Sequence, residues 1–123
     1  MNTKHTIKIE IPLAHQLLID SRAASEEILM HINNADKRRI NDYVIDQLAD
    51  RDGAPELIDL QIGKFQYDEG SQAGTFRLHF KISRRFCCAD TTGCNDDYID
   101  FRFVYGDAKL HADGHYFQWS PDN

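Results

Sequence analysis

The residues of this chain that could do acid–base chemistry lie on one face of a predicted β-sheet. The segments 75–82 (TFRLHFKI) and 98–105 (YIDFRFVY) alternate apolar and polar residues, and successive side chains of a strand point to opposite faces of a sheet. Each segment therefore has an apolar face, which we expect in the core, and a polar face. The titratable residues of the polar face form the first candidate site, whose members are His79, Asp100, His111 and Asp113.

The turn between the last two predicted strands determines which of these side chains face each other. Gly106–Asp107 suits a two-residue type II′ turn, which favours glycine at its first position. This turn predicts Asp100 opposite Asp113, where two carboxylates repel each other and need a cation beside them. In a cleft, one carboxyl group would have a raised pKa and act as an acid, with a histidine as base. On an open sheet the same residues would form an exposed ladder of salt bridges instead.

The three cysteines offer a second kind of chemistry, because thiolates bind zinc. Two of them are adjacent and the third follows six positions later, whereas structural zinc sites usually contain two pairs of ligands spaced two to four residues apart. The predicted register brings Cys94 near His115. The candidate zinc site therefore consists of Cys87, Cys94 and His115, with His111 or Asp96 as a fourth ligand. Ordinary thiols are the alternative, and in that case no cofactor is expected.

A third candidate surface is an acidic helix face. In the segment 35–52 an apolar residue recurs at every fourth position from Ile40 to Leu48, which is typical of an amphipathic helix. Aspartates recur with the same spacing, roughly 200° around the helix from the apolar stripe, so they point outward. This surface is either a solvated face or a docking surface for a basic partner. A predicted polar loop over 87–97 supplies two more aspartates. The candidate partner-binding residues from the helix and the loop together are Asp42, Asp46, Asp50, Asp96 and Asp97.

Length and charge limit the class of protein. The 123 residues suit one domain that spans 1–123. The formal net charge of -6 disfavours nucleic acid as a partner. No segment is apolar over the length that a membrane span needs, and the first residues lack the apolar core of a signal peptide. We therefore expect a cytoplasmic protein that binds neither nucleic acid nor a membrane.

The order of the elements predicts an α+β fold. It begins with an edge strand over 3–11, followed by helical segments over 13–33 (one helix, or two broken near Ser21) and 35–52. A four-stranded antiparallel meander follows, and the helices pack on its apolar face. We expect Ile58 on that apolar face, a bulge at Gly63, and Phe101 opposite Ala112 in the last hairpin. The order resembles that of cystatin-like sheets, a likeness of topology that carries no function.

These patterns favour a small acidic protein-binding module. In concrete form it is an inhibitor or immunity protein (an antitoxin) that neutralises a basic partner such as a nuclease toxin, with the five aspartates steering that partner. The alternative is a small enzyme or a ligand- or metal-binding domain that uses the polar face of the sheet. A homodimer formed through the sheet is a third hypothesis. Whether the polar-face residues line a concavity or lie flat in solvent discriminates between the first two.

Overall fold

The computed structural model describes residues 6–48, 51–86 and 91–116 of the chain. This part of the chain contains five strands, a short 3₁₀ helix and two α-helices, so the predicted α+β class is confirmed. In chain order, the elements are β1 (Thr6–Pro12), η1 (His15–Ile19), α1 (Ser21–His31), α2 (Asn34–Gln47), β2 (Glu56–Asp68), β3 (Ala73–Phe86), β4 (Thr91–Gly106) and β5 (Lys109–His115).

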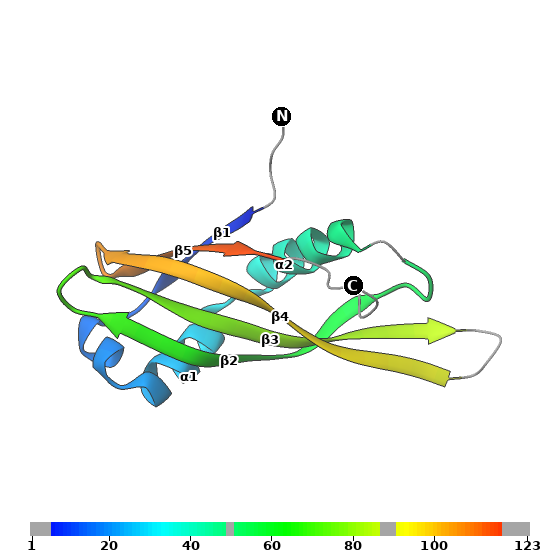
Figure 1. Cartoon of the computed structure of the whole chain (residues 1–123), viewed down its shortest axis with the longest axis horizontal. Coiled ribbons are helices and arrows are strands. Elements are labelled where there is room, and N and C mark those ends of the chain that lie inside the picture. Colours follow the sequence, from blue (N-terminus) through cyan, green and yellow to red (C-terminus); the bar gives the residue numbers. More distant parts are fainter. Residues whose placement is uncertain (1–5, 49–50, 87–90, 117–123) are drawn as a thin grey trace, which may run out of the picture.

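The described strands form one antiparallel sheet in the spatial order β1-β5-β4-β3-β2 (Figure 1). The strands β2 to β5 follow one another as a meander, and β1 pairs with β5 at the edge. The sequence predicts β1 as an edge strand, and the pairing agrees. The edges of the sheet are therefore β1 and β2.

Helix α2 connects these two edges. Its Arg39 guanidinium donates a hydrogen bond to the backbone carbonyl of Lys8 in β1. Two residues further along α2, Asn41 accepts at its Oδ1 a hydrogen bond of 2.9 Å from the backbone N–H of Leu57 in β2. A single helix can contact both edges only if the sheet curls around it. The curl turns the outer edge of β1 toward α2.

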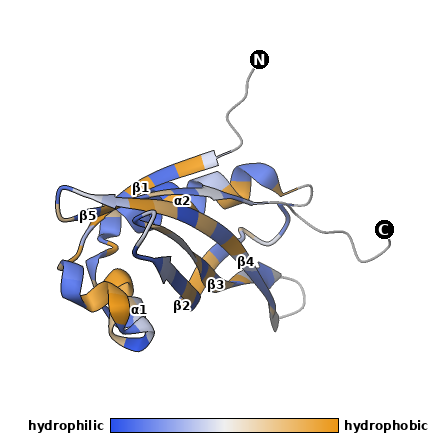
Figure 2. Ribbon diagram, turned by 60° about the vertical axis from the view of Figure 1, so that its left-hand side comes forward, coloured by the Kyte–Doolittle hydropathy of each residue, from blue (hydrophilic) through white to orange (hydrophobic). Residues whose placement is uncertain are grey.

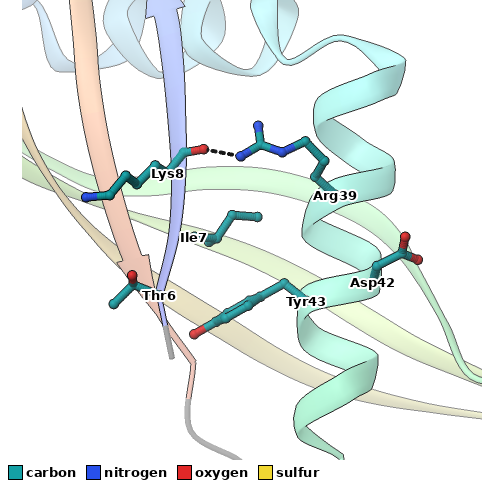
Figure 3. A pocket seen from close by; sticks show the side chains of 6 residues that line it. All are labelled: Thr6, Ile7, Lys8, Arg39, Asp42 and Tyr43. Atoms are coloured by element: carbon teal, nitrogen blue, oxygen red, sulfur yellow. Dashed lines mark hydrogen bonds between the residues drawn. The ribbon is translucent and has the colours of Figure 1, made fainter. Parts of the chain in front are cut away.

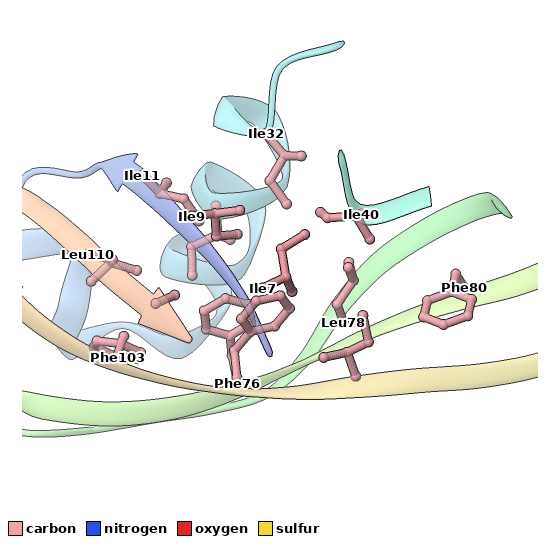
Figure 4. Close-up of a cluster of buried hydrophobic side chains, with 14 of the residues drawn as sticks. Ile7, Ile9, Ile11, Ile32, Ile40, Phe76, Leu78, Phe80, Phe103 and Leu110 are labelled. Atoms are coloured by element: carbon pink, nitrogen blue, oxygen red, sulfur yellow. The ribbon is translucent and has the colours of Figure 1, made fainter. Parts of the chain in front are cut away.

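The core lies between the sheet and the helices, and it contains the side chains that the alternation predicts (Figure 4). Hydrophobic and hydrophilic residues alternate along the strands (Figure 2). Burial of one large apolar side chain contributes about 1.5–3 kcal/mol, so this cluster dominates the stability of the fold. Its main members are Ile7, Ile9, Ile11, Ala24, Ile28, Ile40, Val44, Phe76, Leu78, Phe80, Ile82, Ile99, Phe101, Phe103, Leu110 and Ala112.

The helical region contains two separate elements before α2. Of the two alternatives that the sequence leaves open, the structure shows the break near Ser21: Asp20 separates η1 from α1 and caps α1 by accepting backbone N–H groups of its first turn. Asn33 caps α2 in the same way, with its Oδ1 2.7 Å from a backbone nitrogen. Both are short polar side chains of the kind that favours the N-cap position. Helix α2 ends at Gln47, earlier than the predicted end.

The turn between β4 and β5 corrects the predicted register. Its central residues are Asp107 and Ala108, with φ angles of 54° and 59°, and positive φ at both positions indicates a type I′ turn. Phe101 therefore lies opposite Gly114 and not opposite Ala112. The reason is steric, since a Cβ at Gly114 would lie 2.5 Å from the Phe101 ring. A shift of two residues keeps every side chain on its predicted face.

Strand β2 also departs from its predicted pattern. Its pairing with β3 shifts between Ile58 and Gln61, and Asp59 has a φ of 55°. Ile58 consequently lies opposite Lys81 on the polar side of the sheet, so its predicted place on the apolar face is wrong. A second shift follows Gly63, where the sequence predicts a bulge. Two bulges in one edge strand increase its local twist.

Candidate functional site

The polar face of the sheet is a ladder of ion pairs. Four of its carboxylates each contact a cationic side chain on the adjacent strand. The hydrogen bond to Asp96 raises the pKa of the Lys81 amine, because it stabilises the charged form. The pairs are Lys8–Asp113 (2.7 Å), Arg77–Asp100 (2.7 Å), Lys81–Asp96 (2.9 Å) and Lys109–Glu10 (3.5 Å).

The two aspartates of the first candidate site do not face each other. Asp113 lies opposite Arg102, and Asp100 lies opposite His115. The predicted pairing of the two carboxylates is therefore wrong, as a direct result of the type I′ turn. Their side chains are 60% exposed for Asp100 and 50% exposed for Asp113. Both carboxylates therefore lie largely in solvent and not in a closed cleft.

The two histidines of that candidate site lie on different parts of the sheet. His79 lines an open pocket of about 440 Å³ with Lys81 and Asp96, among other residues. His111 is on β5, with Nε2 3.2 Å from the backbone carbonyl oxygen of Gly106. The structure thus brings neither histidine into a hydrogen bond with Asp100 or Asp113 among the residues it describes.

Arg77 occupies the centre of the polar face. Its guanidinium donates two hydrogen bonds to the Asp100 carboxylate, at 2.7 and 3.1 Å. Its Cζ lies 3.8 Å from the centroid of the Tyr98 ring, in a cation–π arrangement. The hydrogen bonds that Arg77 donates to Asp100 raise the pKa of Arg77. This geometry connects β3 to β4, and both oxygens of the Asp100 carboxylate are bonded to Arg77.

The candidate zinc site is not assembled. Cys94 lies in β4 opposite Ser83, whereas His115 lies opposite Asp100. Six residues along a strand span roughly 20 Å, so Cys94 and His115 cannot hold one ion, and the prediction that they approach each other is wrong. Cys87 lies outside the described residues. Among the residues that are described, no group of three or more His, Cys, Asp and Glu side chains is arranged to hold a metal.

Two of the three aspartates that the sequence predicts on the outer helix face lie on α2. Asp42 and Asp46 are exposed on this helix, and neither side chain has an ion-pair or hydrogen-bond partner in the described part of the chain. Asp50, the third member of the series, lies outside the described residues. Asp36 in the first turn behaves differently, because Arg39 lies 3.3 Å from its carboxylate.

The other two predicted partner-binding residues have structural contacts. Asp96 and Asp97 belong to β4 and not to a loop, so they point to opposite faces of the sheet. Asp97 Oδ2 accepts a hydrogen bond of 2.6 Å from the Tyr116 hydroxyl, and the Tyr116 N–H donates to the hydroxyl of Tyr43 in α2 at 3.1 Å. Burial, together with this contact to Asp97, raises the pKa of Tyr116. Tyr116 therefore links Asp97 of β4 to Tyr43 of α2.

A groove that the sequence did not indicate lies between the outer edge of β1 and α2 (Figure 3). Its volume is about 490 Å³. Figure 3 shows Arg39 reaching from the helix to the backbone carbonyl of Lys8, with Tyr43 and Asp42 further along the helix wall. No local pattern could have revealed it, because Arg39 and Lys8 are 31 positions apart. The lining residues are Thr6, Ile7, Lys8, Arg39, Asp42 and Tyr43.

Comparison of the chain with protein-family models, with curated proteins and with solved structures finds no significant match. Neither described α-helix combines the length and the apolar character that crossing a bilayer requires.

Proposed function

We propose that the chain is a small acidic module that binds a basic segment of a protein partner through the outer face of α2. Asp42 and Asp46 contact basic side chains of that partner. The concrete form is an inhibitor or immunity protein that neutralises a basic protein such as a nuclease toxin. Negative charge at such a surface raises the association rate in a salt-dependent way.

The observation that carries this proposal is the difference in pairing between carboxylates. On the polar face of the sheet, Asp96, Asp100 and Asp113 each have a cation at hydrogen-bond distance. On α2, Asp42 and Asp46 have none among the described residues. Unpaired carboxylates keep their full capacity to accept charge-assisted hydrogen bonds from a partner.

The position of these aspartates within the helix supports the same conclusion. Asp46 lies in the last turn of α2, where the negative end of the helix dipole disfavours an anion. Asp42 precedes it by four residues, and like charges at this spacing repel each other. The arrangement lowers the stability of the helix, which is expected where residues are selected for binding and not for folding.

Capture experiments with charge-matched variants test the proposal. The wild-type chain, the double variant Asp42→Asn/Asp46→Asn and the double variant Asp100→Asn/Asp113→Asn are immobilised, and proteins from the native host are captured at low salt and identified by mass spectrometry. We expect a stoichiometric basic protein on the wild type and on the Asp100/Asp113 variant, and its loss from the Asp42/Asp46 variant. The latter two baits differ from the wild type by the same charge. Recovery of the same proteins on all three would contradict the proposal.

A further inference from the structure

The two edges of the sheet differ in how well they are closed against another strand. The β2 edge has two register shifts and positive φ angles at Asp59 and Lys64, and such bulges are a common protection of edge strands. The β1 edge pairs with β5 without a register shift over its whole length, from Thr6 to Pro12. It is therefore the edge with a regular row of backbone groups, of which the Lys8 carbonyl accepts a hydrogen bond from Arg39.

The hydrogen bond from Arg39 identifies which backbone groups of β1 point outward. In an antiparallel pair, alternate residues direct both their N–H and C=O groups toward the partner strand. The Lys8 carbonyl bonds to Arg39, so Thr6, Lys8 and Glu10 direct their backbone groups away from β5 and toward the groove. Pro12 has the same parity but lacks an N–H, so the available edge ends before it. The open stretch spans roughly 13 Å, enough for a strand of about five residues.

The helix wall of the groove adds chemical selectivity to this edge. Tyr43 and Ile7 provide an apolar surface there, and Asp42 provides an exposed carboxylate without a partner among the described residues. A lysine or arginine side chain can lay its methylene stem on the tyrosine and the isoleucine and place its charge at Asp42. Arg39 has an alternative partner in Asp36, so its charge stays neutralised when an incoming N–H replaces it at Lys8.

We propose that a basic, extended segment of the partner adds to the sheet as a sixth strand beside β1, in the groove between β1 and α2. This inference rests on the proposed function and specifies how the partner is held. Main-chain hydrogen bonds to Thr6, Lys8 and Glu10 supply affinity, and Asp42 selects a basic side chain on the helix-facing side.

Two substitutions at one position separate the backbone from the side chain. Lys8→Pro removes an outward N–H, a change that edge strands tolerate, together with the amine that pairs with Asp113. Lys8→Ala keeps the N–H and removes the amine alone, so the difference between the two variants isolates the backbone hydrogen bond. The probe is a fluorescein-labelled octapeptide of alternating lysine and threonine with blocked termini, and an alternating glutamate and threonine octapeptide is its control. We expect fluorescence anisotropy to show wild-type and Lys8→Ala binding within about threefold of each other, and Lys8→Pro weaker by about tenfold or more.

If Lys8→Pro fails to fold, as judged by circular dichroism, a lysine–threonine peptide that is N-methylated at alternate residues tests the same hydrogen bonds on the wild-type chain. Peptides methylated in the two possible registers should differ, with one register abolishing binding and the other preserving it. Equal binding by wild type and Lys8→Pro, or by all methylated peptides, would overturn the strand-addition inference. A wild-type dimer that Lys8→Pro dissociates would place a second copy on this edge and would also overturn it.

The variant Asp42→Asn/Asp46→Asn separates the two proposals. Loss of lysine–threonine peptide binding in this variant, together with unchanged binding by Lys8→Pro, would support the proposal of a basic partner and contradict the inference of strand addition. Loss in Lys8→Pro, together with equal binding of the lysine and glutamate peptides by the wild type, would keep strand addition and remove the basic partner. Absence of any binding of the lysine peptide by the wild-type chain would overturn the inference.

Discussion

The polar face of the sheet and the outer face of α2 are both rich in aspartate, yet they differ in how those carboxylates are used. On the sheet, cross-strand neighbours neutralise them, as Arg77 does for Asp100. On α2, Asp42 and Asp46 have no such neighbour among the described residues. The contrast teaches that acidic composition alone does not identify a binding surface. What distinguishes Asp42 and Asp46 is that neither carboxylate has an ion-pair partner in the described part of the chain.

Tyr116→Phe tests whether Asp97 belongs with the structural carboxylates, and it carries the largest expected effect. The substitution removes the hydroxyl that donates to Asp97 at 2.6 Å and leaves a partly buried carboxylate short of a donor. We expect a loss of about 1–3 kcal/mol in the free energy of unfolding, measured by urea denaturation, with partner capture unchanged. Tyr98→Phe is the control, because the ring under Arg77 is kept. Equal stability of both variants and the wild type would contradict a structural role for Asp97 and would favour its predicted role in partner binding.

The same tyrosine predicts a pH dependence of stability. The pKa of Tyr116 in the folded chain is raised above the ordinary value of 10.0 by burial first and by Asp97 second. A raised folded pKa means that the stabilisation is complete below pH 10 and is lost as the pH rises beyond it. Urea midpoints measured between pH 8 and 11 should therefore fall less steeply for Tyr116→Phe than for the wild type. Tyr43, whose pKa burial also raises, accounts for part of the slope that remains.

Sequence periodicity predicted the faces of β3 and β4 over 75–82 and 98–105, because that information is local, whereas it placed Ile58 of β2 on the wrong face. Phe76, Leu78 and Phe80 alternate whatever their partners are, and all three are buried. The cross-strand partners were not predictable, because the register depends on the packing of the Phe101 ring against Gly114, a contact between residues far apart in the chain. The faces of the candidate site were thus correct, whereas the pairing of Asp100 with Asp113 was not.

The groove beside β1 was beyond prediction for a related reason. Nothing in the spacing of residues 35–52 indicates that Arg39 reaches the carbonyl of Lys8, because the curl of the sheet brings them together. The opposite holds for Asp42 and Asp46, whose exposure follows from helical geometry alone. The exposure of these aspartates could therefore be predicted from the sequence, whereas the position of α2 beside the edge of β1 could be known only from the structure.

A double-mutant cycle on Arg77 and Asp100 measures how strongly the sheet compensates its own charge. The contact is bidentate, at 2.7 and 3.1 Å, but the Asp100 side chain is 60% exposed, so water weakens it. We expect a coupling energy of about 1 kcal/mol in urea denaturation of Arg77→Ala, Asp100→Ala and the double variant. Arg77→Lys should recover less than half of it, because an ammonium cannot form the two parallel hydrogen bonds. A coupling near zero would remove the distinction between the paired face and α2.

The smallest expected effect, and the most direct test of the contrast, compares two aspartates of α2. Asp36 lies in the first turn beside Arg39, where the helix dipole favours an anion. Asp46 lies in the last turn, where the dipole and the repulsion from Asp42 both oppose it. We expect Asp36→Asn to lower the free energy of unfolding by about 0.5 kcal/mol and Asp46→Asn to raise it by a similar amount. Urea denaturation at low salt measures both changes.

Salt provides the internal control, since about 1 M NaCl shortens the Debye length to roughly 3 Å and should bring both variants close to the wild type. If both substitutions instead lower stability at low salt, Asp46 contributes to the fold and its carboxylate is not uncompensated. If Asp46→Asn stabilises the chain and the Asp42/Asp46 variant also loses the basic partner, these aspartates reduce folding stability while serving binding. Only the second outcome is consistent with a docking surface, because loss of the partner, and not the destabilisation alone, distinguishes such a surface from a solvated face.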